Sequence, residues 1–257
     1  MSGKNQDSVK IKQPKVILCD IEGTTTAITF VKEQLFPYVR AKLRNYLIKT
    51  WNTDTTRDDV RLLFEQYHKD LIDHQMLGHE IDNNGTFNID DVCVYVNWLM
   101  DHDRKVGALK QLQGHIWENG YKTGQILGHV YEDVFRCFHR WTSEFNVKIG
   151  IYSSGSVLAQ KLLFSHSCHG DLTPFISYYF DTNIGPKQSA DSYRLITEKI
   201  DSSANEILFL TDVSEEAKAA KKSGMMAILL ERDGVILSPD DKYAFNFITS
   251  FDKILFT

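Results

Sequence analysis

Four short apolar segments alternate with polar, helix-like stretches along the chain. The apolar segments are residues 16–19, 147–152, 207–210 and 227–230, and the stretches between the later ones, at 156–166, 189–200 and 214–223, have helical spacing. Near-continuous apolar strands separated by helices are typical of a parallel sheet that is covered on both faces. The pattern therefore predicts an α/β fold with a doubly wound parallel sheet.

The long stretch between the first and second apolar segments has a different pattern. Apolar residues recur there at intervals of three and four, as at Val39, Leu43 and Leu47 behind Pro37. This spacing places apolar side chains on one face of a helix, and proline is favoured in a first helical turn. We predict several helices in this stretch, and a further helix at 132–144 that returns the chain to the sheet.

These elements predict an insertion within the sheet domain. We assign residues 1–30 and 130–257 to an α/β core and residues 31–129 to an inserted helical cap. Within the cap, residues 79–88 are rich in Asn, Asp and Gly, which predicts a loop.

Composition narrows the classes of function. The 29 Lys and Arg residues are outnumbered by 34 Asp and Glu residues, and no basic run is present, which argues against binding to nucleic acid or to a membrane surface. The first ten residues are polar, unlike a secretory signal, and the longest apolar run, 225–230, is too short to span a bilayer. The four cysteines are far apart in sequence, as expected of reduced thiols. We expect a monomer in the cytoplasm, with the nucleus as a further compartment.

Polar side chains follow three of the predicted strands directly. Asp20 and Glu22 follow the first, Ser153 and Ser154 the second, and Asp212 the third. Ligands of such sheets bind outside the carboxyl ends of the strands, so these residues are expected to share one site. Asp20 and Glu22 are two positions apart and can face the same point, where they repel each other unless a cation lies between them. The sequence therefore predicts a site for one Mg²⁺ ion per chain.

The acids have the roles that phosphoryl transfer requires. Asp20 would attack phosphorus and form an aspartyl-phosphate, which divides one difficult step into two. Asp212 would supply a second carboxylate to the metal. Glu22 would protonate the leaving oxygen and later deprotonate water, or its backbone carbonyl would be the metal ligand.

Three further residues suit the phosphate. The hydroxyl of Ser153 or Ser154, together with backbone N–H groups at the start of the next helix, would bind phosphate oxygens. Lys187 would supply a positive charge to the nucleophile and the phosphate. Each feature alone has an ordinary explanation, as a turn residue, a helix cap or a surface lysine. Their order at successive strand ends is what favours a shared catalytic site.

The motif Asp20-Ile-Glu-Gly-Thr resembles the first motif of the haloacid-dehalogenase superfamily, with Glu22 in place of that family's second Asp. This departure is similar to one branch of it, the enolase-phosphatases (acireductone synthases) of methionine salvage. Further segments resemble the same branch and extend the resemblance over nearly the whole chain: residues 30–38, 109–114, 151–157, 160–164 and 209–213.

The resemblance implies a Mg²⁺-dependent enzyme with two activities. It would enolise 2,3-diketo-5-methylthiopentyl-1-phosphate and then remove the phosphate to give the acireductone. The group that removes the α-proton would be Glu22 or a residue of the cap. The family's metal positions correspond to Asp20, Glu22 and Asp212, with Asp20 also the nucleophile, and its substrate positions to Ser153, Ser154 and Lys187.

Two other functions are compatible with the fold. One is a plain phosphomonoesterase of the same superfamily that acts on another small phosphate ester. The other is a catalytically silent interaction module, which would have no need of Asp20, Lys187 and Asp212 together.

Overall fold

The computed structural model describes residues 8–73 and 87–257 of the chain. Most of the loop predicted at 79–88 lies outside these residues. The chain groups into two compact units, one of Met1–Glu33 with Leu127–Thr257 and one of Gln34–Ile126. Their assignment as a catalytic core and a cap stays a prediction.

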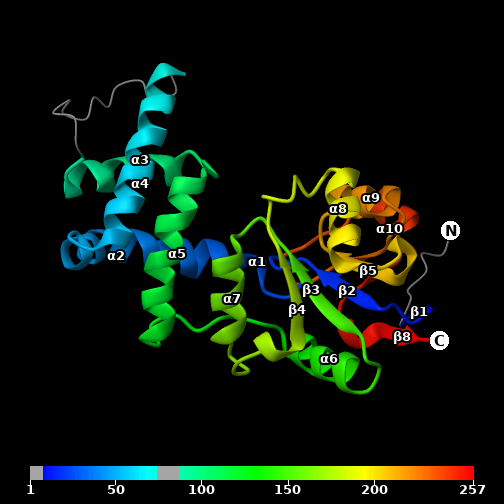
Figure 1. The fold of residues 1–257 in the computed structure, drawn as a ribbon. Helices are drawn as coiled ribbons and strands as arrows, with labels where there is room; N and C mark the ends of the chain where they lie inside the picture. Colours follow the sequence, from blue (N-terminus) through cyan, green and yellow to red (C-terminus); the bar gives the residue numbers. More distant parts are fainter. Residues whose placement is uncertain (1–7, 74–86) are drawn as a thin grey trace. The chain divides into compact units, whose positions relative to one another are not determined.

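The first unit contains a six-stranded sheet in which every pairing is parallel (Figure 1). The order of its strands is β4 (Ile176–Phe180), β3 (Lys148–Tyr152), β2 (Val16–Cys19), β5 (Ile207–Thr211), β6 (Met226–Leu230) and β7 (Phe247–Ile248). The chain passes from β2 outward to β3 and β4, and then crosses to β5 on the other side of β2. Such a reversal opens a crevice at the carboxyl ends of the two strands. The predicted doubly wound parallel sheet is confirmed.

Burial explains which strands the sequence pattern identifies. All residues of β2 and β5 are buried, as expected for central strands that are covered on both faces. The four strands that the apolar segments predict correspond to β2, β3, β5 and β6. The edge strands β4 and β7 were not predicted. β4 is largely half-buried and β7 is only two residues long, so neither forms a continuous apolar run.

Helices cover both faces of this sheet. Figure 1 shows α8 (Ala190–Ile200) and α9 (Ser214–Lys222) on one side of the strands and α6 (Glu132–Ser143) on the other. Tyr193 of α8 packs on Phe209 of β5, with their rings 5.2 Å apart, and Trp141 of α6 stacks on Phe251 at 5.4 Å. The remaining helical segments are α1 (Ile28–Phe30), η1 (Val31–Leu35), α7 (Val157–Ser165), η2 (Thr173–Phe175), η3 (Ala204–Glu206), α10 (Pro239–Ala244) and η4 (Phe251–Lys253). The helices predicted at 132–144, 156–166, 189–200 and 214–223 are confirmed.

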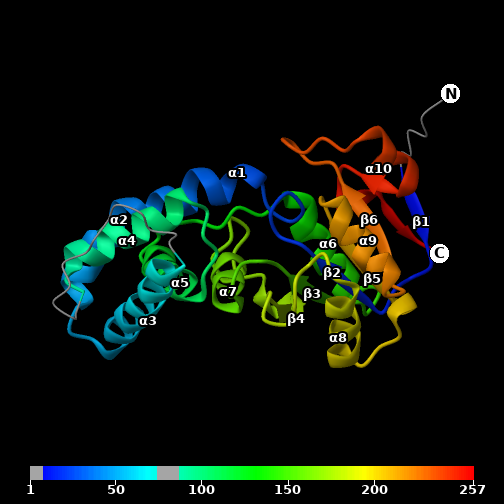
Figure 2. The same cartoon turned by 90° about the horizontal axis from the view of Figure 1, so that it is seen from above.

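A second, two-stranded sheet joins the two ends of the described chain. β1 (Val9–Ile11) pairs in parallel with β8 (Ile254–Phe256), and both views show these strands side by side (Figures 1 and 2). Three-residue strands carry too little pattern to be recognised in the sequence.

The second unit is a group of packed helices. These are α2 (Phe36–Thr50), α3 (Asp54–Ile72), α4 (Ile89–Asp101) and α5 (Gly107–Lys122). The predicted periodicity is confirmed in α2, where Val39, Leu43 and Leu47 are buried and Pro37 lies in the first turn. Trp117 of α5 is also buried, and its indole N–H donates to the carbonyl of Leu35 at 3.0 Å.

Two observations bear on the setting of the protein. Among the described residues, no helix combines the length and the apolar character needed to cross a membrane. All four cysteines are free, with Cys19 and Cys137 buried, Cys93 half-buried and Cys168 exposed.

Candidate active site

The strand register places Asp20 at the reversal point of the sheet. Cys19, the last residue of β2, is aligned with Ile151 of β3 and with Leu210 of β5. The next residue is Asp20, whose backbone N–H donates to the carbonyl of Leu210 at 2.9 Å. The segments that follow β3 and β5 therefore begin on either side of Asp20, and Asp212 lies on the β5 side.

The turn after β2 requires glycine at position 23. Gly23 has a φ of +73°, and a Cβ there would lie 2.4 Å from Oδ2 of Asp212. Both the left-handed backbone and the close approach of Asp212 therefore exclude a larger residue without rearrangement. The carbonyl of Ile21 closes the turn by accepting three N–H groups, from Thr24 at 3.1 Å, Thr25 at 2.9 Å and Thr26 at 2.9 Å.

Lys187 forms a buried ion pair with the predicted nucleophile. Its Nζ lies 2.5 Å from Oδ1 of Asp20 and 2.7 Å from Oε2 of Glu216. Burial alone would lower the pKa of Lys187, but the charges of Asp20 and Glu216 outweigh it and raise the pKa. The lysine is therefore a permanent cation next to the Asp20 carboxylate.

Neighbouring side chains fix the loop that carries Lys187. The hydroxyl of Tyr193, in α8, donates to the Lys187 carbonyl at 2.7 Å, and the hydroxyl of Tyr152, at the end of β3, donates to the Gly185 carbonyl at 2.9 Å. Gly185 has a φ of +138°, and a Cβ there would lie 2.3 Å from Oγ of Ser192. The Gly185-Pro186-Lys187 sequence thus permits a close approach to α8 that directs the lysine inward.

Asp212 and Glu216 give the site more negative charge than Lys187 can balance. Burial first, and then the charge of Asp20, raises the pKa of Asp212 to about 7. Burial and Asp20 also raise the pKa of Glu216, which accepts a hydrogen bond from Thr211 at 2.8 Å. With one lysine facing three carboxylates, the arrangement favours binding of a further cation.

The donor set fits a hard divalent cation. Oδ1 of Asp212 is buried and has no hydrogen-bond partner within the described structure. A buried carboxylate oxygen without a partner is costly, and a cation would satisfy it. In the described ranges, no three His, Cys, Asp or Glu side chains come together as a complete metal site. Mg²⁺ typically takes one or two carboxylates and keeps several waters, which matches Asp20 and Asp212.

The other predicted site residues follow the carboxyl ends of neighbouring strands: Glu22 follows β2, and Ser153 and Ser154 follow β3. Glu22 is half-buried and bridges to Thr26 within the turn after β2. Ser153 is buried directly after β3, where its hydroxyl accepts the N–H of Gly155 at 3.2 Å. Ser154, next in the chain, is exposed. Their positions at strand ends agree with a shared site, and their roles stay predictions.

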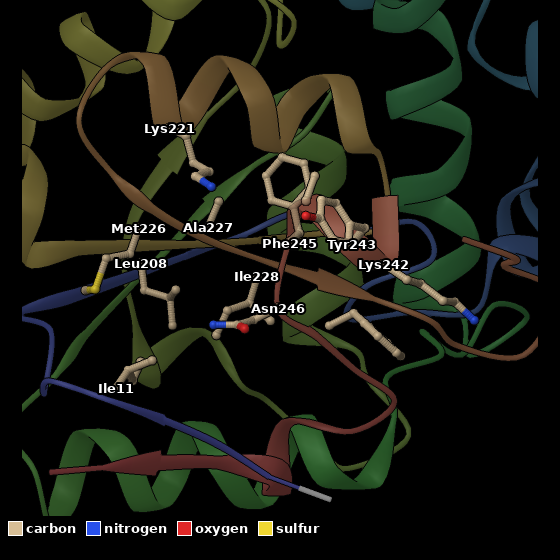
Figure 3. Close-up of a pocket in the computed structure, with 12 residues that line it drawn as sticks. Ile11, Leu208, Lys221, Met226, Ala227, Ile228, Lys242, Tyr243, Phe245 and Asn246 are labelled. Atoms are coloured by element: carbon tan, nitrogen blue, oxygen red, sulfur yellow. The ribbon is translucent and has the colours of Figure 1, made fainter. Parts of the chain in front are cut away.

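A separate cavity lies at the opposite end of the sheet. It has a volume of about 460 Å³, and Figure 3 shows Leu208, Met226 and Lys221 on its wall. Leu208 and Met226 belong to the amino-terminal halves of β5 and β6. None of the predicted site residues lines this cavity.

Comparisons with known proteins identify the family. A family model described as haloacid dehalogenase-like hydrolase matches residues 14–224. The enolase-phosphatase E1 of Danio rerio is 45% identical over 93% of this chain and 94% of its own length. The chain belongs to the enolase-phosphatase family of haloacid dehalogenase-like hydrolases. This assignment confirms the family that the Asp20-Ile-Glu-Gly-Thr motif indicated.

Two further relatives show how this enolase-phosphatase chain relates to others in length and fold. The enolase-phosphatase E1 of Aedes aegypti is 46% identical over 95% of this chain, which spans only 22% of that longer protein. The crystal structure of the UTR4 protein from Saccharomyces cerevisiae matches with a TM-score of 0.74 and 34% identity, over 93% of this chain and 99% of that one.

Sequence reasoning about this enolase-phosphatase missed Glu216. The residue lies in α9, four positions after Asp212, and shares Lys187 with Asp20. Asp212 precedes the helix, so no helical spacing relates Glu216 to it, and no clear signal in the sequence marks this residue. The role of Tyr152 and Tyr193 in holding the Lys187 loop could not be predicted, because their sequence positions are typical of core residues.

Proposed function

We propose that this enolase-phosphatase acts on 2,3-diketo-5-methylthiopentyl-1-phosphate, which it enolises and then dephosphorylates to the acireductone. The observation that carries the proposal is the buried contact of Lys187 with Asp20, beside the partnerless Asp212 oxygen, where the order of the strands reverses. An anionic nucleophile, a fixed cation and a further carboxylate together are what phosphoryl transfer requires.

Phosphate removal proceeds in two displacement steps. A carboxylate oxygen of Asp20 attacks phosphorus, the ester P–O bond breaks, and Glu22 gives its proton to the leaving oxygen. Glu22 then takes a proton from water, whose oxygen attacks phosphorus and releases both inorganic phosphate and the Asp20 carboxylate. Lys187 contacts Oδ1 of Asp20 and orients this carboxylate for attack.

One Mg²⁺ ion would be held by Asp20 and Asp212, together with Glu22 through its side chain or its backbone carbonyl. When bound, the ion would reduce the charge of the phosphate and polarise the diketone, which favours both activities. The raised pKa of Asp212 supports this assignment, because the crowding of carboxylates in the protein alone is unfavourable.

Ser153, Ser154 and Lys187 bind the phosphate in this proposal. Ser153 is buried directly after β3, and Asp20 directly follows the neighbouring strand β2. Both residues therefore follow the carboxyl ends of adjacent parallel strands, which supports this role. Because Asp20 is the nucleophile in this proposal, the two serine hydroxyls bind phosphate oxygens and do not attack phosphorus.

The proposal extends to organisation and setting. The α/β core, at 1–30 and 130–257, carries the chemistry, and residues 31–129 form the helical cap. The protein acts as a monomer on a small molecule, without nucleic acid or membrane, in the cytoplasm and in the nucleus. Size-exclusion chromatography with light scattering tests the monomer, and imaging of the tagged protein tests the compartment.

The decisive experiment follows enol formation by ultraviolet absorbance and phosphate release together, with and without Mg²⁺. An enol signal followed by phosphate, both requiring Mg²⁺, is expected. Phosphate without the enol, with faster turnover of another small ester, would instead indicate a plain phosphomonoesterase. Folded protein that yields neither product, with Asp20→Asn leaving its cellular role intact, would indicate a silent module.

A further inference from the structure

Arg232 is a buried residue that contacts the turn containing the predicted catalytic acids. It lies two residues beyond β6 and is only 7% exposed. Its Nε–H donates to the backbone carbonyl of Thr24 at 3.1 Å. Thr24 follows Gly23, so the arginine holds the same short turn that begins with Asp20 and Glu22. None of the roles assigned above uses this side chain.

Hydrogen bonds, an ion pair with Asp133 and two aromatic rings hold the guanidinium. Its Nη1 donates to Oδ1 of Asp133 at 3.0 Å and to the carbonyl of Thr249 at 3.2 Å. The guanidinium carbon also lies over two rings, 4.3 Å from the centroid of Tyr131 and 5.1 Å from that of Phe251. Guanidinium groups pack favourably on aromatic faces, which adds to the contacts that hold this side chain.

Asp133 is held as firmly as the arginine. It lies in the first turn of α6 and is 8% exposed. Its Oδ2 accepts hydrogen bonds from the Ser250 hydroxyl at 3.0 Å and from the Phe251 N–H at 2.7 Å. Arg232 and Asp133 therefore connect the catalytic turn to α6 and to the segment that follows β7.

A buried ion pair of this kind contributes little net stability, because removing both charges from water costs about as much as their attraction returns. Its geometry serves another purpose. The Arg232 bond to Thr24 opposes rotation of the turn, and a displacement of about 1 Å in a catalytic group can cost on the order of 100-fold in rate. A fixed carbonyl at Thr24 keeps the preceding peptides, and hence Asp20 and Glu22, in one orientation.

We propose that Arg232 is a positioning residue for phosphoryl transfer, acting through the Thr24 carbonyl. This inference rests on the proposed function, since it concerns the rate of that reaction. The hydrogen bonds and ion pair of Arg232 that the structure describes go to Thr24, Asp133 and Thr249, none of which is assigned as nucleophile or metal ligand. It sets the orientation of the turn from outside the site.

The test compares Arg232→Lys with Asp133→Asn. Lysine keeps a cation for Asp133 but lacks the Nε–H that reaches Thr24. Asparagine removes the charge partner and leaves the Arg232 bond to Thr24 in place. With folding checked by circular dichroism and Tm, we expect Arg232→Lys to lower kcat at least tenfold with KM within twofold. Asp133→Asn, even with an equal loss of Tm, is expected to keep kcat within about threefold.

The inference is overturned if Arg232→Lys keeps kcat within twofold, or if both variants lose kcat in proportion to Tm. If Arg232→Lys does not fold, Arg232→Gln takes its place, because its amide still donates hydrogen bonds but lacks the Nε–H that reaches Thr24. A threefold or larger loss of kcat at constant KM is then expected, and unchanged kcat overturns the inference. Wild-type protein assayed alongside separates the two proposals, since an inactive wild type contradicts the function and not the role of Arg232.

Discussion

The ammonium nitrogen of Lys187 lies 2.5 Å from a carboxylate oxygen of Asp20, with both side chains more than nine-tenths buried. This contact joins the end of the central strand β2 to the loop between β4 and α8. It brings together residues 167 positions apart in the sequence. The predicted nucleophile is therefore held by a cation from a loop far away in the sequence.

Replacing that cation tests its role. Lys187→Met removes the cation that contacts Asp20 and Glu216, so the predicted nucleophile loses the group that orients it and balances its charge. We expect a loss of about 10²–10³-fold in kcat, the range typical of removing one preorganised charged or hydrogen-bonding group. Steady-state phosphate release measures it, with Lys187→Arg as the variant that keeps the charge. A loss below tenfold for Lys187→Met would contradict the assignment.

Gly23→Ala is expected to disturb Asp212 specifically. The new Cβ would lie 2.4 Å from Oδ2 of Asp212, and the backbone has a φ of +73°. Gly170→Ala is a matched control, because Gly170 has a φ of +84° and nothing within 4 Å of the new Cβ. Both variants should lose about 1–2 kcal/mol of stability from the left-handed backbone. Only Gly23→Ala should weaken Mg²⁺ binding by calorimetry, and equal binding by the two variants would refute this account.

Asp212→Asn is expected to make the metal-free protein more stable while it abolishes activity. The pKa of Asp212 is raised to about 7, so its charged form is disfavoured in the folded state. Because the pKa of Asp212 is higher in the folded protein than in the unfolded chain, the free energy of unfolding is full below the unfolded-state pKa and falls as pH rises through the folded-state pKa. Asparagine avoids that loss, and its advantage should therefore be larger at pH 8 than at pH 5.

The expected gain at pH 8 is on the order of 2 kcal/mol, because each pKa unit corresponds to about 1.4 kcal/mol and part of the shift is screened. Urea unfolding without metal measures it. Added Mg²⁺ should raise the Tm of the wild type and leave that of Asp212→Asn unchanged. A variant that Mg²⁺ still stabilises as strongly as the wild type would exclude Asp212 as a ligand.

We expect the protein to lose stability in mild acid because of His129. Its Nδ1 accepts the N–H of Ala27 at 3.0 Å and faces the hydroxyl of Thr26 at the same distance, which requires an unprotonated Nδ1. Burial first, and then the charges of His169 and Arg232, lower the pKa of His129 from its usual 6.5.

The unfolded chain therefore binds a proton at His129 before the folded protein does, and stability falls as pH drops below about 6.5. Urea unfolding between pH 7.5 and 5.5 measures this slope. His129→Gln keeps an acceptor for Ala27 but does not titrate, so its slope should be smaller. An identical slope in the variant would show that other groups cause the loss.

The sequence identified the central strands and the polar residues at their ends, because strands buried on both faces leave continuous apolar runs. β4 escaped prediction because it lies at the edge of the sheet and is only half-buried. Asp20 and Asp212 could be assigned to one edge from topology alone.

The contact of Lys187 with Asp20 could not be predicted from the sequence, because it depends on how Tyr193 and Ser192 hold a loop. Arg232 gave no signal for the same reason, since its partners come from three distant segments.

The pairing of β2 with β3 has a consequence for the way the chain folds. More than a hundred residues separate these hydrogen-bonded neighbours, and β5 lies still further along the chain. Closing so long a loop costs entropy, although each doubling of its length adds only about 0.6 kcal/mol. Helices α2 to α5 form contacts within that loop and shorten it when they pack. We therefore expect these helices to form before the sheet, so that Asp20 and Asp212 come together only late in folding.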